Sequence, residues 1–254
     1  FDSTKVKKND IFFAIKGSKI DGNDFISDAI KRGAKIIVTE KKVKKLKNGI
    51  LFIYTENIRK LLAEISFKIY KKKPKNLIAV TGTNGKSSVA NFYHQILSLN
   101  KKKVASIGTL GVKSKDVNLN LSNTTIDPIQ LGQILLRLKN KKINNVIMEA
   151  SSHGLKQNRL DGLKFSTAIF TNLSQDHLDY HKNINNYLNA KLYLFKNLLK
   201  KKGSVITDGE IPQFKKIKNI SMKNNFKLLT LKDKKNNFEI LSHSFEGEYQ
   251  ILKI

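Results

Sequence analysis

The stretch from Ala79 to Ser88 combines residue types that bind phosphate. Its sequence is Ala-Val-Thr-Gly-Thr-Asn-Gly-Lys-Ser-Ser, and it lies between a short apolar run and a helical pattern that begins at Lys86. Gly82 and Gly85 can adopt positive φ and let the backbone approach a ligand closely. Lys86 would reach the β- and γ-phosphates of a nucleotide, and the Ser87 hydroxyl would hold Mg²⁺. The stretch therefore predicts a phosphate-binding loop for ATP.

The match to the general pattern of such loops is incomplete. That pattern has Gly at the position of Val80, and Gly-Lys-Ser is short enough to occur in an ordinary turn. The context favours the binding loop, because an apolar strand precedes it and an amphipathic helix follows. Backbone amides at the helix N-terminus would then point at the anion. The expected ATP-binding residues are Thr81, Gly82, Thr83, Asn84, Gly85, Lys86 and Ser87.

A carboxylate stands at the end of another apolar strand. Glu149 closes the run Val146-Ile-Met-Glu149, and Ala-Ser-Ser-His-Gly-Leu155 follows it. In phosphate-loop enzymes a carboxylate at this position holds Mg²⁺. The alternative is a solvent-facing Glu, but the small and hydroxyl-bearing residues after it suit a loop that is lined by ligand. We therefore predict that Glu149 is a metal ligand.

A second polar cluster, Asn172-Leu-Ser-Gln-Asp-His-Leu-Asp-Tyr-His181, also follows an apolar strand. It offers two Asp and two His within one short segment, and either type could bind metal or stabilise phosphate. Asp179 and His181 could instead cap the next helix, and His177 is the stronger candidate for a functional role. The spacing is not that of a common zinc module, and the chain has no cysteine.

Several segments together resemble one known family. They are Thr81-Gly-Thr-Asn-Gly-Lys-Ser-Ser88, Asn123-Thr-Thr125, Glu149-Ala-Ser-Ser-His-Gly-Leu-Lys-Gln-Asn-Arg159 and Asn172-Leu-Ser-Gln-Asp-His-Leu-Asp179. In this order they are similar to the Mur ligase family. Asp2-Ser3 and the segment Ile15-Lys-Gly-Ser-Lys-Ile-Asp-Gly22 resemble the UDP-binding first domain of the branch that extends UDP-muramoyl-dipeptides. The resemblance spans nearly the whole chain.

The resemblance implies an ATP-dependent ligase that forms an amide bond through an acyl phosphate. The implied reaction adds the third amino acid to UDP-N-acetylmuramoyl-L-alanyl-D-glutamate in peptidoglycan precursor synthesis. That amino acid would be meso-diaminopimelate, with lysine as the other choice. The implied cofactors are ATP and Mg²⁺. The implied partners are the UDP-muramoyl-dipeptide and the amino acid.

The resemblance also implies roles for individual residues. The catalytic residues would be Lys86, His177 and Lys191. Lys191 would be carbamylated by CO₂, which converts its cation into an anion that can support a metal; from the residues alone, it is one lysine among many. The metal ligands would be Ser87, Glu149, His177 and Lys191. The UDP-substrate would contact Ser3, Ser18, Lys19, Ile20, Asn123, Thr124, Thr125, Ser151, Gln157 and Arg159.

Two features depart from the family's pattern. Thr4 stands where the family has arginine after Asp-Ser, within the expected uridine site. The family also has a third, Rossmann-like domain, which binds the incoming amino acid, and the 254 residues do not include it. We therefore expect a fragment whose start lies in the first domain and whose end lies in the central domain.

Strands and helices alternate along the chain, which predicts an α/β fold. Residues 1–73 are expected to form a small N-terminal α/β domain that binds UDP. The polar stretch 71–76, which contains Pro74, is the expected linker. Residues 74–254 are expected to form a central domain with the phosphate loop and a mainly parallel sheet. After Gly203 this domain is expected to become β-rich.

Individual elements follow from periodicity and from capping residues. The expected strands are 10–15, 35–39, 50–54, 77–80, 103–107, 145–148, 166–171, 204–206, 227–231, 238–241 and 249–254. The expected helices are 25–32, 58–69, 86–99, 128–138 and 184–199. Asn57 and Asp127 are expected to cap two of these helices at their N-termini.

The composition bears on partners and location. The chain carries 48 Lys and Arg against 20 Asp and Glu, which gives a formal net charge of +28. The lysines form short scattered runs, and no basic patch with interleaved aromatic residues is present. We therefore expect no specific nucleic-acid binding. No apolar run approaches the ~20 residues that span a bilayer. We expect a cytoplasmic monomer with no membrane span.

Two alternative functions stay open. A folylpolyglutamate synthetase-like ligase shares the phosphate loop and the acyl-phosphate chemistry, but it does not need Asn123-Thr-Thr125 or a UDP-binding first domain. A basic nucleic-acid-binding P-loop ATPase would suit the charge of the chain. Binding tests with UDP-sugars, folates and oligonucleotides would separate the three.

Overall fold

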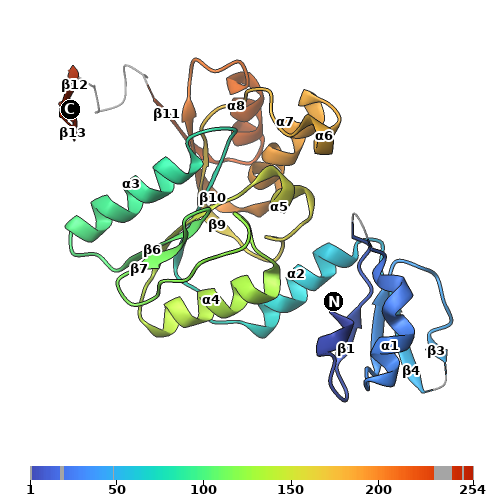
Figure 1. The fold of residues 1–254 in the computed structure, drawn as a ribbon. Helices are drawn as coiled ribbons and strands as arrows, with labels where there is room; N and C mark the ends of the chain where they lie inside the picture. Colours follow the sequence, from blue (N-terminus) through green and yellow to red (C-terminus); the bar gives the residue numbers. More distant parts are fainter. Residues whose placement is uncertain (1, 18–19, 48, 232–241, 248, 254) are drawn as a thin grey trace. The chain divides into compact units, whose positions relative to one another are not determined.

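The computed structural model describes residues 2–17, 20–47, 49–231, 242–247 and 249–253. The chain forms two compact units (Figure 1). The first unit comprises Phe1–Lys71, Asp127–Ile134 and Gln157–Leu163, and the second comprises Lys72–Ile126, Leu135–Lys156 and Lys164–Ile254. Two segments from far along the chain therefore pack with the N-terminal segment. The functional domains 1–73 and 74–254 stay a prediction.

The first unit is built on a four-stranded sheet with the order β1-β2-β4-β3. Its strands are β1 (Ile11–Phe13), β2 (Ile36–Thr39), β3 (Leu46–Lys47) and β4 (Ile50–Tyr54). β1, β2 and β4 pair in parallel, and β3 pairs antiparallel with β4. The three strands expected in this part of the sequence are confirmed.

Helices cover the first unit's sheet and fill its two cores. They are α1 (Ile26–Lys31) and α2 (Ile58–Ile69), with short 3-10 turns at Ser3–Lys5 and Gly22–Phe25. Side chains alternate along β1, so Phe12 joins a cluster with Ile37 while Phe13 joins a second cluster with Leu62. The Asn57 side chain accepts a hydrogen bond from the Lys60 amide at 2.9 Å, which confirms the predicted N-cap of α2.

The two distant segments are attached to the first unit by specific contacts. The Asn57 side-chain amide donates to the Asn158 side-chain oxygen at 3.0 Å, and the Gln133 side-chain amide donates to the Tyr70 hydroxyl at 3.1 Å. A Cβ at Gly132 would overlap with the Tyr70 ring. These contacts explain why residues 127–134 and 157–163 belong to this unit.

The second unit is built on a seven-stranded sheet with the order β11-β10-β9-β5-β8-β6-β7. Its strands are β5 (Asn76–Thr81), β6 (Val104–Gly108), β7 (Gly111–Ser114), β8 (Asn145–Glu149), β9 (Phe165–Phe170), β10 (Leu199–Asp208) and β11 (Lys227–Leu231). All neighbours pair in parallel except β6 and β7. The predicted mainly parallel sheet is confirmed.

The order of this sheet determines where its chemistry can gather. β5 lies between β8 and β9, and β6 lies on the far side of β8. The carboxyl ends of these four strands therefore meet at one edge of the sheet. Thr81, Gly108, Glu149 and Phe170 end the four strands.

Helices connect the strands of the second sheet. They are α3 (Lys86–Leu99), α4 (Pro128–Asn140), α5 (Ser152–Lys156), α6 (Leu178–His181), α7 (Ile184–Tyr193) and α8 (Phe214–Lys223), with a π-helical turn at Leu194–Leu198. The Asp127 carboxylate accepts hydrogen bonds from the Ile129 and Gln130 amides, each at 3.0 Å, which confirms the predicted start of α4. The expected helix 184–199 is two elements, because the π-helical turn ends at Leu198 and β10 begins at Leu199.

The expectation of a β-rich part after Gly203 is wrong for residues 203–231. Helix α8 lies between β10 and β11, and both strands extend the parallel sheet. The helix has few apolar positions, and only Ile217 and Ser221 on it are buried. The expected strand 238–241 lies outside the described residues. β12 (Ser242–Glu246) and β13 (Tyr249–Lys253) form a separate antiparallel hairpin (Figure 1).

Among the described residues, no helix has the length and apolar character needed to cross a membrane.

Candidate active site

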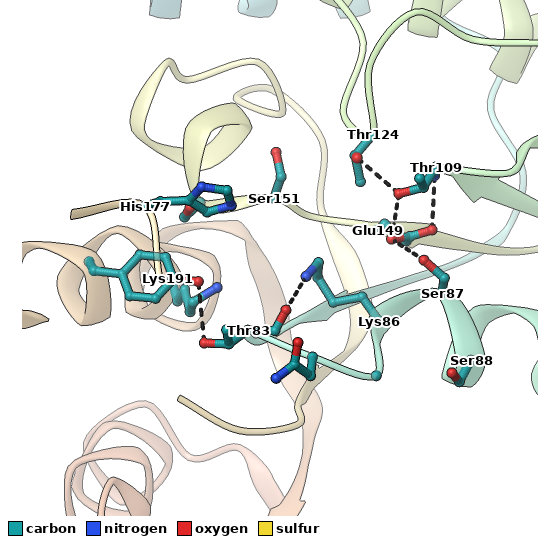
Figure 2. Close-up of a pocket in the computed structure, with 14 residues that line it drawn as sticks. Thr83, Lys86, Ser87, Ser88, Thr109, Thr124, Glu149, Ser151, His177 and Lys191 are labelled. Carbon is teal, nitrogen blue, oxygen red and sulfur yellow. Dashed lines mark hydrogen bonds between the residues drawn. The ribbon is translucent and has the colours of Figure 1, made fainter. Parts of the chain in front are cut away.

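A pocket of about 370 Å³ opens at the carboxyl edge of the second unit's sheet (Figure 2). All of its lining residues belong to this unit. They come from the loop after β5, from the ends of β6 and β8, from the segment before α4 and from α6–α7. The lining residues are Thr83, Asn84, Gly85, Lys86, Ser87, Ser88, Thr109, Thr124, Glu149, Ser151, Ser152, His177, Tyr187 and Lys191.

The loop between β5 and α3 has the backbone that the sequence predicts. Gly85 has a φ of 81° and precedes the first residue of α3, and no side-chain cap covers the helix N-terminus at this residue. A Cβ at Gly82 would overlap with the Thr171 hydroxyl, so only glycine allows the loop to pass so close to the strand next to it. The first amides of α3 are therefore available to an anion in the pocket.

Segments after β9 hold this loop in place. The Asn84 amide donates to the Asn172 side-chain oxygen at 2.9 Å, and the Thr171 hydroxyl donates to the Asn84 carbonyl oxygen at 2.6 Å. The Thr83 amide donates to the Asn172 carbonyl oxygen at 3.0 Å. The start of the second polar cluster therefore supports the phosphate loop mechanically, which the sequence pattern did not indicate.

Lys86 is folded back over its own loop. Its Nζ donates to the carbonyl oxygens of Gly82 at 3.1 Å and Thr83 at 2.7 Å. Burial lowers the pKa of Lys86, and the charges of Glu149 and Asp176 act in the opposite direction. The Lys86 ammonium is thus at the wall of the pocket, where a phosphate could replace the carbonyl oxygens as its partner.

Glu149 is 3% exposed, and three donors hold its carboxylate. Oε2 accepts hydrogen bonds from the Ser87 hydroxyl at 3.0 Å and the Thr109 hydroxyl at 3.2 Å. Oε1 accepts from the Thr109 amide at 2.9 Å. A buried carboxylate needs such partners, because desolvation of an unpaired one is costly. The structure therefore brings the predicted metal residues Ser87 and Glu149 together.

Lys191 is one of the most deeply buried residues of the chain, with 1% exposure. Its Nζ donates to the Gly82 carbonyl oxygen at 2.6 Å and lies 4.2 Å from the centre of the Tyr187 ring. Burial lowers the pKa of Lys191 to about 7, and the nearby charge of Lys86 adds to the effect. A large fraction of this amine is therefore neutral near pH 7, and a neutral amine is a nucleophile.

His177 stands at the rim of the pocket. It has a φ of 50° and precedes the first residue of α6. Its Nε2 lies 3.4 Å from a carboxylate oxygen of Asp176, and its ring centre is 4.8 Å from that of His153. The predicted residue thus lines the same pocket as Lys86 and Glu149.

Neither Asp179 nor His181 is the N-cap of the next helix. Asn183 caps α7, and its side chain accepts a hydrogen bond from the Asn186 amide at 2.9 Å. His181 is 4% exposed and packs against the rings of His153, Tyr180 and Tyr187. Burial, followed by the charge of His153, lowers the pKa of His181 to about 4, so the ring is neutral.

The predicted UDP-substrate residues fall into four groups. Thr124 and Ser151 line the pocket, and exposed Asn123 precedes Thr124. Thr125 is buried: its hydroxyl donates to the Glu149 carbonyl oxygen and accepts from the Ser151 amide, each at 2.9 Å. The residues in the first unit are Ser3, Ile20, Gln157 and Arg159. Ser18 and Lys19 lie outside the described residues.

Sequence reasoning assigned no role to four of the pocket residues, which are Ser88, Thr109, Ser152 and Tyr187. Thr109 directly follows β6, so it stands at the carboxyl end of a strand, as Glu149 does. Its position after a predicted strand was the feature of the sequence that could have indicated a role in the site. Tyr187 precedes Lys191 by one helical turn, and its hydroxyl lies 3.3 Å from the Thr83 hydroxyl. The predicted loop residues Thr83 to Ser87 all line the pocket, whereas Thr81 is buried at the end of β5 and Gly82 is buried and is not among the lining residues.

A parallel sheet, a glycine loop that leads into a helix, a lysine at that helix's first turn and a strand-end carboxylate beside it define a P-loop protein of the α/β class. The comparisons with known proteins narrow this class. Residues 80–254 match the family model of the Mur ligase middle domain, and residues 1–72 match that of the Mur ligase family, catalytic domain. The chain therefore belongs to the Mur ligase family, which confirms the predicted family.

Individual relatives are similar over the same residues. The UDP-N-acetylmuramoyl-L-alanyl-D-glutamate–2,6-diaminopimelate ligase of Rickettsia prowazekii is 43% identical over 257 residues, which cover 100% of this chain and 51% of the relative. The ligase of the same name from Brucella melitensis is 43% identical over 200 residues, which cover 79% of this chain and 41% of the relative. The chain spans about half the length of the curated relatives it matches.

A solved structure of a ligase with that name is similar in fold. It superposes with a TM-score of 0.83 and 28% sequence identity, and the match covers 99% of this chain and 52% of the solved one.

Proposed function

We propose that this chain is part of an ATP-dependent ligase that adds meso-diaminopimelate to UDP-N-acetylmuramoyl-L-alanyl-D-glutamate through an acyl phosphate. The 43% identity to a diaminopimelate ligase over the whole chain supports the substrates. The observation that carries the chemistry is the meeting of Lys86, Glu149 and Lys191 around one pocket. Such a ligase acts in the synthesis of peptidoglycan precursors.

The phosphate loop would bind the triphosphate of ATP. The amides at the start of α3 face the pocket, and the helix dipole favours negative charge there. Lys86 would exchange the carbonyl oxygens of Gly82 and Thr83 for phosphate oxygens. Its charge would then offset the charge that develops as the γ-phosphoryl group leaves ATP for the D-Glu carboxylate.

The donor set of the pocket fits Mg²⁺. Ser87 and Glu149 supply hydroxyl and carboxylate oxygens 3.0 Å apart, and Mg²⁺ prefers oxygen ligands. Among the described residues, no cluster of three or more His, Cys, Asp or Glu is suited to a metal ion. Mg²⁺ commonly uses one or two carboxylates together with substrate phosphates and waters. When bound, the ion would neutralise phosphate charge.

Lys191 would carry a carbamate. Its low pKa leaves much of the amine neutral, so the nitrogen lone pair can attack the carbon of CO₂. The new N–C bond forms as one C=O pair moves to oxygen, and the nitrogen loses a proton to solvent. The resulting anion would complete a metal-ligand set with Ser87, Glu149 and His177, in a pocket that also contains the phosphate loop.

The last step would be attack of an amino group of diaminopimelate on the acyl phosphate, with phosphate as the leaving group. Thr124 and Ser151 lie on the pocket wall, where the UDP-substrate's peptide would have to end. The residues that select the amino acid are expected beyond this chain. Ser3, Ser18, Lys19, Ile20, Asn123, Thr125, Gln157 and Arg159 stay predicted contacts of the UDP-substrate. A cytoplasmic monomer that binds no specific nucleic acid also stays a prediction.

Calorimetry on the 254-residue chain tests this proposal. We expect it to bind UDP-N-acetylmuramoyl-L-alanyl-D-glutamate, and to bind neither a folate nor an oligonucleotide at physiological salt. We also expect no phosphate release with any amino acid, because orientation and exclusion of water need a closed site. Folate binding would favour a folylpolyglutamate synthetase-like ligase. Oligonucleotide binding that resists salt would favour the nucleic-acid-binding ATPase. Tripeptide synthesis by these 254 residues alone would contradict the expectation that they do not form a closed, active site.

A further inference from the structure

Glu149 has an orienting partner that sequence reasoning did not find. Thr109 is the first residue after β6, and β6 is the direct neighbour of β8, which ends at Glu149. Through its amide and its hydroxyl, Thr109 donates to both oxygens of the Glu149 carboxylate, at 2.9 and 3.2 Å. Figure 2 shows the two residues side by side on the pocket wall.

The direction of the neighbouring hydrogen bond follows from proton counting. A threonine hydroxyl has one proton, and that of Thr109 is donated to Glu149. The Thr109 and Thr124 hydroxyl oxygens are 2.9 Å apart, so Thr124 must be the donor to Thr109. Thr124, Thr109 and Glu149 therefore form a chain of hydrogen bonds with one direction. In such a chain each bond polarises the next, and the bond to a carboxylate is charge-assisted.

Gly108 provides the space for this arrangement. A Cβ at Gly108 would overlap with the side chain of Glu149, so the carboxylate lies directly over the backbone at the end of β6. Gly108 and Thr109 thus hold Glu149 from two sides, one through close approach and the other through hydrogen bonds. The remaining hydrogen bond to this carboxylate comes from Ser87, which belongs to the phosphate loop.

We infer that Thr109 is the positioning residue that fixes the Glu149 carboxylate for a divalent cation, with Gly108 providing the space. This inference rests on the proposed function of the same pocket. Partners that orient a metal ligand without touching the metal change metal affinity by about 10- to 100-fold when they are removed. A carboxylate held through both oxygens has little freedom to rotate, so its orientation in the pocket is set before the cation arrives.

The test measures metal binding directly, with Mn²⁺ as the probe. The 254-residue chain is saturated with a non-hydrolysable ATP analogue and titrated with Mn²⁺, and bound metal is followed by electron paramagnetic resonance. Wild type is expected to bind Mn²⁺, and Glu149→Gln is expected to lose this binding. Thr109→Val, which keeps the shape and the amide but lacks the hydroxyl, is expected to weaken Mn²⁺ binding by about 10- to 100-fold.

Two variants separate positioning from a loss of structure. Thr109→Ser retains the hydroxyl and is expected to restore Mn²⁺ affinity close to that of wild type. Thr207→Val is the matched control, since Thr207 lies in β10 of the same sheet, and its hydroxyl donates to the Phe170 carbonyl oxygen at 3.1 Å outside the pocket lining. We expect it to leave Mn²⁺ binding unchanged. Gly108→Ala is expected to weaken Mn²⁺ binding in protein that still melts cooperatively.

The outcomes distinguish the inference from the proposed function. If Thr109→Val binds Mn²⁺ like wild type while Glu149→Gln does not, the positioning role is wrong and the proposed function stands. If Thr109→Ser is as weak as Thr109→Val, the hydroxyl is not what matters and the inference fails as well. If wild type binds neither the analogue nor Mn²⁺, the proposed function of the pocket fails and the inference fails with it.

Discussion

The phosphate loop and the buried corner formed by His181, Tyr187 and Lys191 both contribute residues to the wall of one pocket but differ in how they are built. The loop is one contiguous stretch whose glycines and lysine sit at fixed spacing. The corner is assembled by α6 and α7, and its lysine reaches the Gly82 carbonyl oxygen over 109 residues of sequence. The residues of the loop are therefore recognisable from local sequence, whereas the corner depends on burial.

Burial changes the chemistry of the two lysines to different degrees. Burial is the main cause of a lowered pKa in both, but only Lys191 is shifted as far as about 7. Lys86 keeps the charges of Glu149 and Asp176 nearby, which favour its ammonium form. The loop lysine is thus suited to hold phosphate as a cation, and the corner lysine is suited to react as an amine.

The largest effect is expected from Lys86→Ala in an enzyme that contains this chain and has the full length of its relatives. Loss of a preorganised charge at the transferred phosphate should lower kcat by about 100- to 1,000-fold. Because the side chain is only half-buried, the melting temperature should change little. Steady-state kinetics and thermal denaturation measure the two. Turnover near that of wild type would contradict the role of the loop.

A somewhat smaller and partly reversible effect is expected from Lys191→Ala. Removal of the carbamate should lower turnover by about 100-fold, and short carboxylic acids that fit the vacated space should restore part of it. Lys86→Ala is the matched control, since an anion cannot replace a lost cation and no rescue is expected there. An inactive Lys191→Ala that no carboxylic acid rescues would point to a structural lysine instead.

The difference between the two regions also explains what could be predicted from the sequence. Residues from Thr83 to Ser87 and Glu149, which line the pocket, could be predicted because their signals are local: a strand, a glycine turn, a helix start and a strand end. Lys191 was assigned only through the family resemblance, since nothing in its neighbours indicates 1% exposure among 48 basic residues. Its burial arises when α7 packs beneath the phosphate loop.

Other features of the structure could not be predicted from the sequence for the same physical reason, because they depend on tertiary contacts. Helix α8 was missed because its few apolar residues stand among lysines, and burial of Ile217 against the sheet is a tertiary contact. Thr109 was missed because one threonine after a strand is common, and its importance appears only when β6 and β8 are adjacent. A polar residue at the end of a strand becomes a candidate site residue once the strand order places it beside another one.

The smallest effect on catalysis, and the one most specific to the buried corner, is expected from His181→Phe. The pKa of His181 is lowered from 6.5 to about 4 in the folded chain. Above pH 6.5 the ring is neutral in both states. As the pH falls from 6.5 to 4, the unfolded chain takes up a proton that the folded chain refuses, so stability is lost. Each unit of pKa difference corresponds to about 1.4 kcal/mol.

Phenylalanine keeps an aromatic ring at this position and does not titrate. Within the part of the chain that the structure describes, the Nε2 of His181 has no hydrogen-bond partner that the substitution would remove. The unfolding free energy of His181→Phe, from urea denaturation between pH 7 and 4.5, should therefore fall less steeply than that of wild type. Tyr180→Phe, which changes an adjacent ring and leaves His181 in place, should retain the wild-type slope. Parallel curves for wild type and His181→Phe would show that the corner accepts a charged imidazolium. The contrast with the phosphate loop would then rest on Lys191 alone.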